Sequence, residues 1–195
     1  MSFYPDAMSL REARTLFFER GKLGADGGYS SRWVRVESKP IAFYFPNSGS
    51  RVAAARLHDL HHIAAEYDTD WLGEAEIAAW EIASGCTHYH AAWILNLGGF
   101  AVGLIIAPNR LFRAFVRGRR TRTNLYHTGF SDLQLDDVTV GMLRARLTMG
   151  APSVKARGSD VAMFAAWSAA AALWLLLPVV AIVAGFFIVG MAAHR

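Results

Sequence analysis

The sequence predicts an all-α protein, with a helical domain over residues 1–153 and a C-terminal apolar membrane segment over residues 161–193, joined by a linker over residues 154–160. Three observations support this prediction. Several segments are rich in alanine or carry apolar residues at the spacing of one helix face. Strand patterns are weak throughout the chain. Residues 161–193 contain no charged side chain, which excludes a fully soluble chain and a disordered one.

Each helix expected in the first domain has a local start or stop signal. Gly21 and Gly85 are suited to end helices, and Asp68 and Asp70 offer side-chain oxygens to the start of another. Pro108 separates an apolar helix from a short basic one. Residues 24–31 are expected to form a loop, and residues 33–50 an extended, irregular segment. The expected helices span residues 8–20, 51–67, 71–84, 91–107, 110–117 and 136–149.

The C-terminal run is too long for one upright span. As a helix it would measure about 50 Å, against about 30 Å for the hydrocarbon core of a bilayer. Pro178 divides it into two parts that are each short for a span. We expect one tilted or kinked span, with part of the run in the interface or packed on the first domain. A re-entrant hairpin is the alternative.

Basic residues flank this run unevenly. The positive-inside rule therefore places the first domain on the cytoplasmic side of the cell inner membrane, with the C-terminus outside. The N-terminus has no apolar core of a secretory signal, which agrees with this orientation. The flanking residues are Arg144, Arg146, Lys155 and Arg157 before the run and Arg195 after it.

The net charge of +4 arises from 20 basic and 16 acidic residues and is too small to indicate nucleic-acid binding. Six arginines between residues 110 and 122 follow the apolar segment 91–107 directly. A cationic segment beside an apolar one favours an anionic membrane surface, and no nucleic-acid partner is expected. The single cysteine, Cys86, suits a reducing compartment.

The residues that indicate chemistry are His58, Asp59, His62 and Glu74. On a helix, His58 and His62 lie one turn apart and point the same way, so two imidazoles could share one metal ion. Asp59 lies at the edge of that face. Glu74 lies among apolar neighbours in the next helix, where a carboxylate needs a cation or a proton. A mixed nitrogen and oxygen site suits Zn²⁺, with Fe²⁺ or Mn²⁺ as alternatives.

Other polar residues near this motif are expected to have different roles. His61 points to the side of the His58 and His62 face and is expected to be structural. His88 and His90 follow Gly85 in a turn and are expected at the surface. Glu81 lies two turns after Glu74, and we expect a surface salt bridge there, with a position behind the metal ligands as the alternative.

The motif matches the signature His-Asp-x-x-His-x(11)-Glu, so the chain resembles the coenzyme Q (ubiquinone) biosynthesis proteins that carry it. The likeness extends in order of elements over residues 7–153 and includes residues 140–147 before Ala151-Pro152. The resemblance implies an all-α fold, association with the membrane and Zn²⁺. The ligands, which would also be the catalytic residues, would be His58, Asp59, His62 and Glu74.

The resemblance also implies an activity, the oxidative decarboxylation at C1 of a polyprenylated 4-hydroxybenzoate. The chain would then be a metal-dependent carbon–carbon lyase whose partners are a polyprenylated aromatic lipid, the membrane and other ubiquinone biosynthesis enzymes. The C-terminal apolar segment departs from the family pattern. Two alternatives stay open: a non-catalytic lipid-binding scaffold of the biosynthetic complex, and a membrane di-iron hydroxylase in which His58, His61 and His62 form a histidine box.

Overall fold

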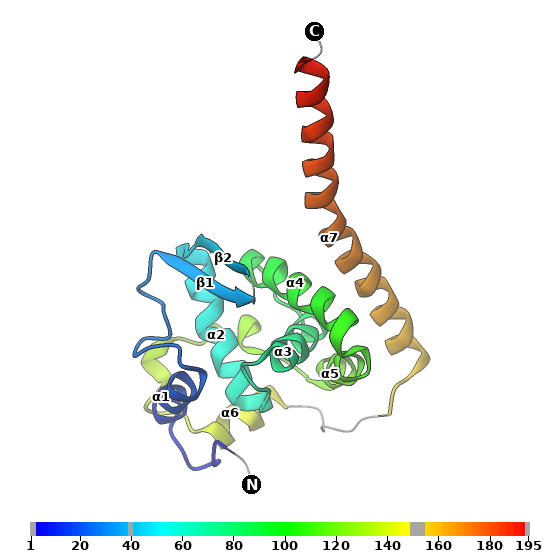
Figure 1. Ribbon diagram of the computed structural model, residues 1–195. Coiled ribbons are helices and arrows are strands. Elements are labelled where there is room, and N and C mark those ends of the chain that lie inside the picture. The colour runs from blue at the N-terminus through cyan, green and yellow to red at the C-terminus, as the bar shows by residue number, and fades with distance from the viewer. Residues whose placement is uncertain (1–2, 39–40, 149–154, 194–195) are drawn as a thin grey trace.

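The computed structural model describes residues 3–38, 41–148 and 155–193, with side chains for residues 3–35, 44–148 and 155–176. It confirms the predicted helical fold (Figure 1). Only one two-stranded sheet accompanies the helices in the described part of the chain. The elements are α1 (Leu10–Gly21), β1 (Trp33–Ser38), β2 (Ile41–Pro46), α2 (Gly49–Ala65), α3 (Trp71–Ser84), α4 (His90–Ile106), α5 (Pro108–Arg120), the short turns η1 (Leu125–His127) and η2 (Asp132–Gln134), α6 (Val140–Leu147) and α7 (Gly158–Ala193).

Local capping residues fix most helix boundaries. Ser9 and Glu12 form a reciprocal capping box at the start of α1. The Asp70 side chain accepts a hydrogen bond from the Gly73 amide at the start of α3, whose bounds agree with the prediction. Pro108 occupies the first turn of α5, where its missing N–H costs nothing. Helix α5 therefore begins at the proline instead of two residues after it.

The prediction of a helix over residues 136–149 is wrong at its start. Thr139 caps α6, which begins at Val140, and the Asp136 carboxylate instead pairs with Arg11 of α1. Residue 136 therefore belongs to a turn that ties the end of the domain to its beginning. The predicted end at Met149 lies outside the described residues.

Helix α3 lies at the centre of the domain, packed between α4 and α5 (Figure 1). Trp80, Phe100 and Phe115 are among its largest fully buried side chains. Gly118 permits the close approach of α5, because a Cβ atom there would lie 2.4 Å from the Trp80 carbonyl oxygen. The tight packing of α3 fixes the positions of the acidic residues on it.

Residues 33–46 form a β-hairpin, where the sequence analysis expects an irregular segment. Trp33 pairs with Pro46, and Arg35 pairs with Tyr44, in an antiparallel register. The side chain of Asn47 stabilises the base of the hairpin by donating hydrogen bonds to the carbonyl oxygens of Gly28, Tyr29 and Ser31.

Helix α7 begins at Gly158, within the range predicted as a linker, and its backbone continues without interruption past Pro178. A re-entrant hairpin with its turn at Pro178 is therefore not present. The first half of α7 packs on the domain. The centroid of the Phe164 ring lies 5.0–5.5 Å from the ring centroids of Phe100, Phe112 and Phe115. The Trp167 ring stacks on Trp93 with centroids 5.4 Å apart. Among residues with described side chains, Gly158–Leu176 is long and apolar enough to cross a membrane.

Candidate metal centre

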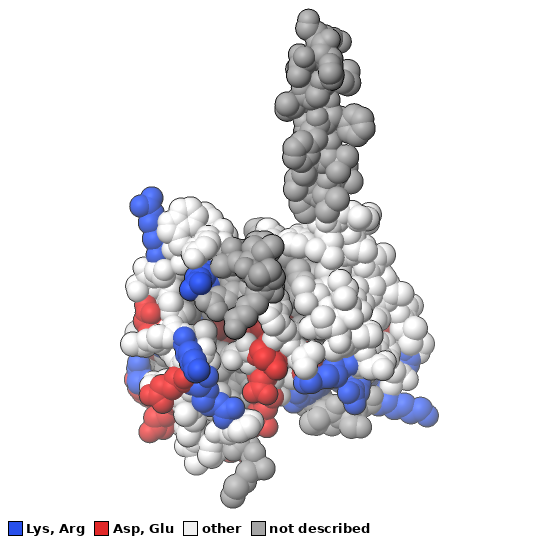
Figure 2. Space-filling model, in the orientation of Figure 1, with Lys and Arg blue, Asp and Glu red and all other residues white. Residues whose placement is uncertain are grey.

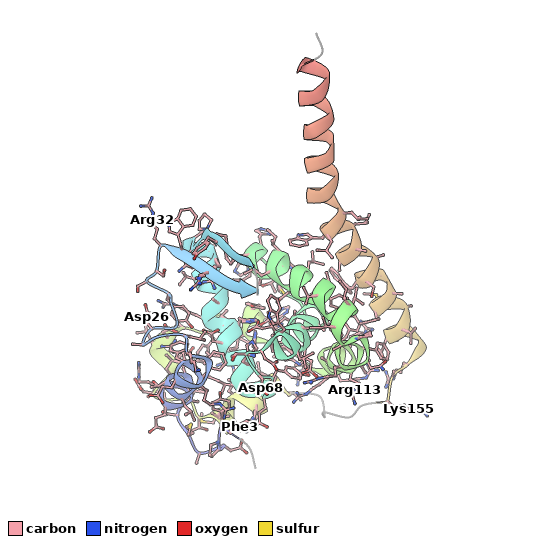
Figure 3. All side chains as sticks on the ribbon, viewed as in Figure 1. Phe3, Asp26, Arg32, Asp68, Arg113 and Lys155 are labelled. Atoms are coloured by element: carbon pink, nitrogen blue, oxygen red, sulfur yellow. The ribbon has the colours of Figure 1, made fainter. Side chains whose placement is uncertain are left out.

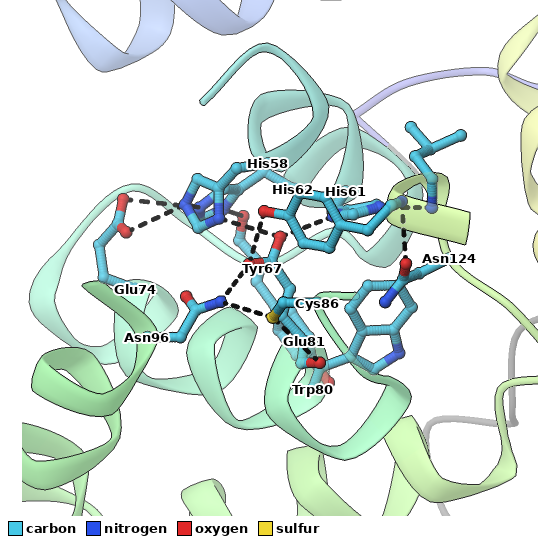
Figure 4. A network of polar contacts seen from close by, with 12 residues as sticks. His58, His61, His62, Tyr67, Glu74, Trp80, Glu81, Cys86, Asn96 and Asn124 are labelled. Carbon is cyan, nitrogen blue, oxygen red and sulfur yellow. Dashed lines mark hydrogen bonds and ion pairs between the residues drawn. The ribbon is translucent and has the colours of Figure 1, made fainter. Parts of the chain in front are cut away.

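The sequence-predicted histidines meet one carboxylate at the α2–α3 corner (Figure 4). His58 and His62 lie one helical turn apart on α2, and Glu74 lies in the first turn of α3. The two Nε2 atoms are 3.1 Å apart. The Glu74 carboxylate oxygens lie 3.4 Å from His58 Nε2 and 3.5 Å from His62 Nε2. Three ligand atoms of the types that bind zinc thus point at one place.

The outer nitrogen of each of these rings has a fixed acceptor. The His62 Nδ1–H donates to the Tyr67 carbonyl oxygen at 3.0 Å, and a carbonyl can only accept. The His58 Nδ1–H donates to Glu81 Oε1, also at 3.0 Å. Metal-binding histidines typically donate their second N–H to a carbonyl or carboxylate in this way. Both Nε2 atoms therefore present lone pairs to Glu74 when the rings are neutral.

These lone pairs and carboxylates need a positive charge between them. Without a cation, one ring must take a second proton, and burial opposes this while the Glu81 and Glu74 carboxylates raise the pKa of His58 well above its usual value. Burial acts to raise the pKa of Glu74, but His62 and His58 hold it below the usual range. Tetrahedral zinc with bonds of about 2.0–2.1 Å separates its ligand atoms by about 3.3 Å. The observed distances match this geometry, so the residues fit a divalent cation.

Asp59 is not part of this group of converging atoms. Its buried carboxylate accepts a hydrogen bond from the Tyr29 hydroxyl, on the loop before β1. Burial raises the pKa of Asp59 and of Tyr29, which keeps the phenol protonated as the donor. The structure thus brings together His58, His62 and Glu74, and holds Asp59 beside them through Tyr29.

Glu81 is fully buried, and the expected surface salt bridge is wrong. Oε1 accepts from His58 and from His61 Nδ1 at 2.6 Å. Oε2 accepts from the Asn96 amide at 2.6 Å and from the Tyr126 hydroxyl at 3.0 Å. Burial would raise the pKa of Glu81, but the imidazoles of His58 and His61 hold it below its usual range. Glu81 therefore contacts the outer nitrogen of the candidate ligand His58. This is the position behind the metal ligands that the sequence analysis gave as the alternative to a surface salt bridge.

Both ring nitrogens of His61 are engaged away from the candidate centre. The Leu125 backbone N–H donates to His61 Nε2 at 2.9 Å, so this nitrogen is an acceptor and Nδ1 carries the proton given to Glu81. Burial lowers the pKa of His61, in agreement with a neutral ring. His61 is structural, as expected, and does not complete a histidine box. His88 and His90 are exposed, also as expected.

Most of the arginines between residues 110 and 122 form ion pairs or hydrogen bonds within the protein. Arg110 pairs with Glu76 at 2.6 Å, and Arg117 donates to the Ala65 carbonyl oxygen at 2.9 Å. Arg119 and Arg120 both bind the buried carboxylate of Asp160 at the start of α7. This cluster holds α5 to its neighbours.

Sequence reasoning missed Tyr29, Tyr67, Asn96 and Tyr126. Asn96 carried a signal, because it is the one polar residue of an otherwise apolar helix. Tyr67 acts through its backbone carbonyl, and Tyr29 and Tyr126 lie outside the motif in the sequence. The motif therefore gives no signal for these three residues. Comparisons with protein-family models, with curated proteins and with solved structures give no match to this chain.

Proposed function

We propose that this chain is a membrane-associated metalloprotein that binds a divalent cation through His58, His62 and Glu74. The convergence of two Nε2 atoms and a carboxylate carries this proposal, because the Nδ1 atoms of both rings are committed to acceptors. Zn²⁺ is the ion favoured by this donor set, with Fe²⁺ and Mn²⁺ as alternatives. Asp59, the fourth residue of the resembled motif, stays a predicted ligand.

The site is open on one side, which favours binding of an exchangeable group. The Glu74 side chain is 43% exposed, whereas the His62 side chain is 1% exposed and that of Glu81 is fully buried. Catalytic zinc sites typically use three protein ligands and leave a fourth position open, while structural sites are closed. The protein's own residues would orient the histidines through Glu81 and Tyr67 and leave the Glu74 side accessible.

We further propose that the reaction is decarboxylation at C1 of a polyprenylated 4-hydroxybenzoate in ubiquinone biosynthesis. This proposal is supported by the motif of His58, Asp59, His62 and Glu74, and by an apolar helix suited to a membrane where a prenylated substrate would reside. The C1–carboxylate bond breaks, carbon dioxide leaves, and the electron pair left on the ring carbon takes a proton from water. A bound divalent ion would stabilise the negative charge on a substrate oxygen. Replacement of the carboxylate by a hydroxyl would need dioxygen or a partner enzyme, because zinc has no redox chemistry.

The test combines metal analysis with an activity assay on the full chain purified in detergent. We expect close to one metal ion per chain and release of carbon dioxide from the prenylated substrate. His62→Ala should lose both, while the exposed His88→Ala serves as the matched control. Bound zinc without turnover would support the scaffold alternative, and a chain without metal would overturn the site itself.

A genetic test addresses the pathway. In an organism that makes ubiquinone, a strain from which this chain is deleted should accumulate a prenylated ring that still carries its C1 carboxylate. Rescue by the wild-type chain and not by His58→Ala would connect the pathway step to the metal site. Normal ubiquinone levels in the deletion strain would contradict the assignment.

A further inference from the structure

Helix α7 has two parts with different surroundings. Residues 158–173 pack on α4 and α5 through Phe164, Trp167 and the fully buried Ala171. Beyond Trp174, whose ring lies against Gly98, the helix projects away from the domain (Figure 1). Residues 174–193 carry no charge and measure about 30 Å as a helix, which is about the thickness of the hydrocarbon core. The projecting part alone therefore has the length of a span.

The hairpin carries exposed aromatic residues at the end of the domain from which α7 projects. Figure 1 shows the hairpin and the beginning of α4 at that end. The register places Trp33 and Tyr44 on the same face of the hairpin, and they are 51% and 62% exposed. Arg32, which precedes Trp33 in the chain, lies at the same end of the domain (Figure 3). The Arg51 guanidinium of α2 lies 5.8 Å from the centre of the Phe45 ring of β2. A two-stranded hairpin on its own is only marginally stable in water.

Further apolar residues are exposed on α4 and α7. Ile94 and Leu95 near the start of α4 are exposed, as are Leu173 and Leu176 on α7 where it leaves the domain. Aromatic rings beside arginine and aliphatic side chains are the composition that proteins place at the headgroup level of a bilayer. Large exposed apolar side chains at one end of a domain indicate a binding surface.

The opposite end of the domain differs in charge. Arg113 and Lys155 lie there, far from the projecting part of α7 (Figure 3). Figure 2 shows Lys and Arg gathered along that lower edge, and few charged groups on the visible surface below the emergence of α7. The arginines of α5 therefore do not lie at the level where residues 174–193 would enter a bilayer.

We propose that residues 174–193 span the bilayer and that the end of the domain carrying Trp33, Tyr44, Ile94 and Leu95 rests on the headgroups of the same leaflet. The occupant of this surface is the phospholipid bilayer, because the adjoining helix enters it and fixes its position. The inference rests on the membrane part of the proposed function and is independent of the metal. Asn96 of α4 donates to Glu81, and Tyr29 in the loop before β1 donates to Asp59, so α4 and the loop that leads into the hairpin contact residues next to the candidate site.

The test is spin labelling of the full chain in nanodiscs of phosphatidylcholine and phosphatidylglycerol. One spin label is attached to each of the single-cysteine substitutions Tyr44→Cys, Leu95→Cys and Leu133→Cys. Leu133 on η2 is 88% exposed and serves as the control. The native Cys86 is buried, and the unsubstituted chain measures its background labelling. A second series of labels runs along α7. Collisions with dissolved oxygen and with a water-soluble nickel chelate report immersion depth.

We expect several-fold lower nickel collision at Tyr44 and Leu95 than at Leu133, and greatest depth on α7 near residue 183. Equal nickel collision at the three sites would overturn the surface. Greatest depth near Trp167 would place the span at Gly158–Leu176 and overturn the inference. Shielding of Tyr44 and Leu95 that persists in detergent, in a sample that sizes as a dimer, would assign the surface to a second copy. Metal content of the same samples tests the metal proposal separately.

Discussion

The cluster of His58, His62 and Glu74 and the network around Glu81 share one residue but are built differently. The cluster joins two consecutive helices, and its ligand spacing is written in a short piece of sequence. The network joins α2, α3, α4 and η1, and its members Glu81, His61, Asn96 and Tyr126 are buried and joined by hydrogen bonds. Local sequence therefore selects the ligands, whereas long-range packing holds them in position.

This difference predicts that damage to the network affects both folding and metal binding. In Glu81→Gln, one carboxylate oxygen becomes an amide donor and faces groups that also donate. We expect a loss of about 3 kcal/mol in the free energy of unfolding, and metal affinity weaker by about 10–100-fold. Denaturation in detergent and a metal titration measure the two effects. Glu19→Gln, on the exposed face of α1, is the control. If Glu81→Gln left the unfolding free energy and the metal affinity unchanged, the network would not support the metal site.

Damage to the cluster should affect the metal and spare the fold. Glu74→Gln keeps the size of a half-exposed side chain but removes its charge. We expect metal affinity to fall by more than about 100-fold, beyond what a change behind a ligand causes. The unfolding free energy of the metal-free protein should fall by no more than about 1 kcal/mol, because the lost pairing of Glu74 with a protonated histidine is half-exposed to solvent. Glu76→Gln, on the same helix and paired with Arg110, is the control for the loss of a paired carboxylate away from the cluster. Full metal occupancy in Glu74→Gln would exclude Glu74 as a ligand.

His61 separates the two regions most directly, because it belongs to the network alone. His61→Ala leaves the Leu125 N–H without its acceptor and removes one of the two donors to Glu81 Oε1, which should cost about 2 kcal/mol of stability. The metal should stay bound at the wild-type stoichiometry. Metal analysis together with thermal denaturation checks this, and His88→Ala is the control. Loss of the metal from a folded His61→Ala protein would instead support the alternative in which His58, His61 and His62 form a histidine box.

The same contrast explains what the sequence could predict. Helix α3 agrees with its predicted bounds because Asp70 and Gly85 act on their own neighbours. The three converging ligands were identified because helical spacing alone aligns His58 with His62. These are local effects.

The errors arise where distant residues decide. The start of α6 shifts from residue 136 to Val140 because Asp136 is held by Arg11, far away in the chain. The hairpin depends on pairing between two strands that each give a weak signal. Glu81 is buried because Asn96 and Tyr126 arrive from α4 and η1, and no spacing along α3 indicates them.

The smallest expected effect concerns Asp59, which stands between the two regions. Tyr29→Phe removes the hydroxyl that donates to Asp59 and should cost about 1 kcal/mol of stability. Asp59→Asn keeps an oxygen that can accept from the Tyr29 hydroxyl but removes a negative charge next to His58. If the motif uses Asp59 as the fourth ligand, Asp59→Asn should weaken metal binding by about tenfold, and Tyr29→Phe by less than about threefold. Titration of both variants with Zn²⁺ measures the difference, with the exposed Tyr44→Phe as control. Equal weakening in the two variants would show that Asp59 serves only to anchor the loop before β1, and the ligand set would then consist of His58, His62 and Glu74.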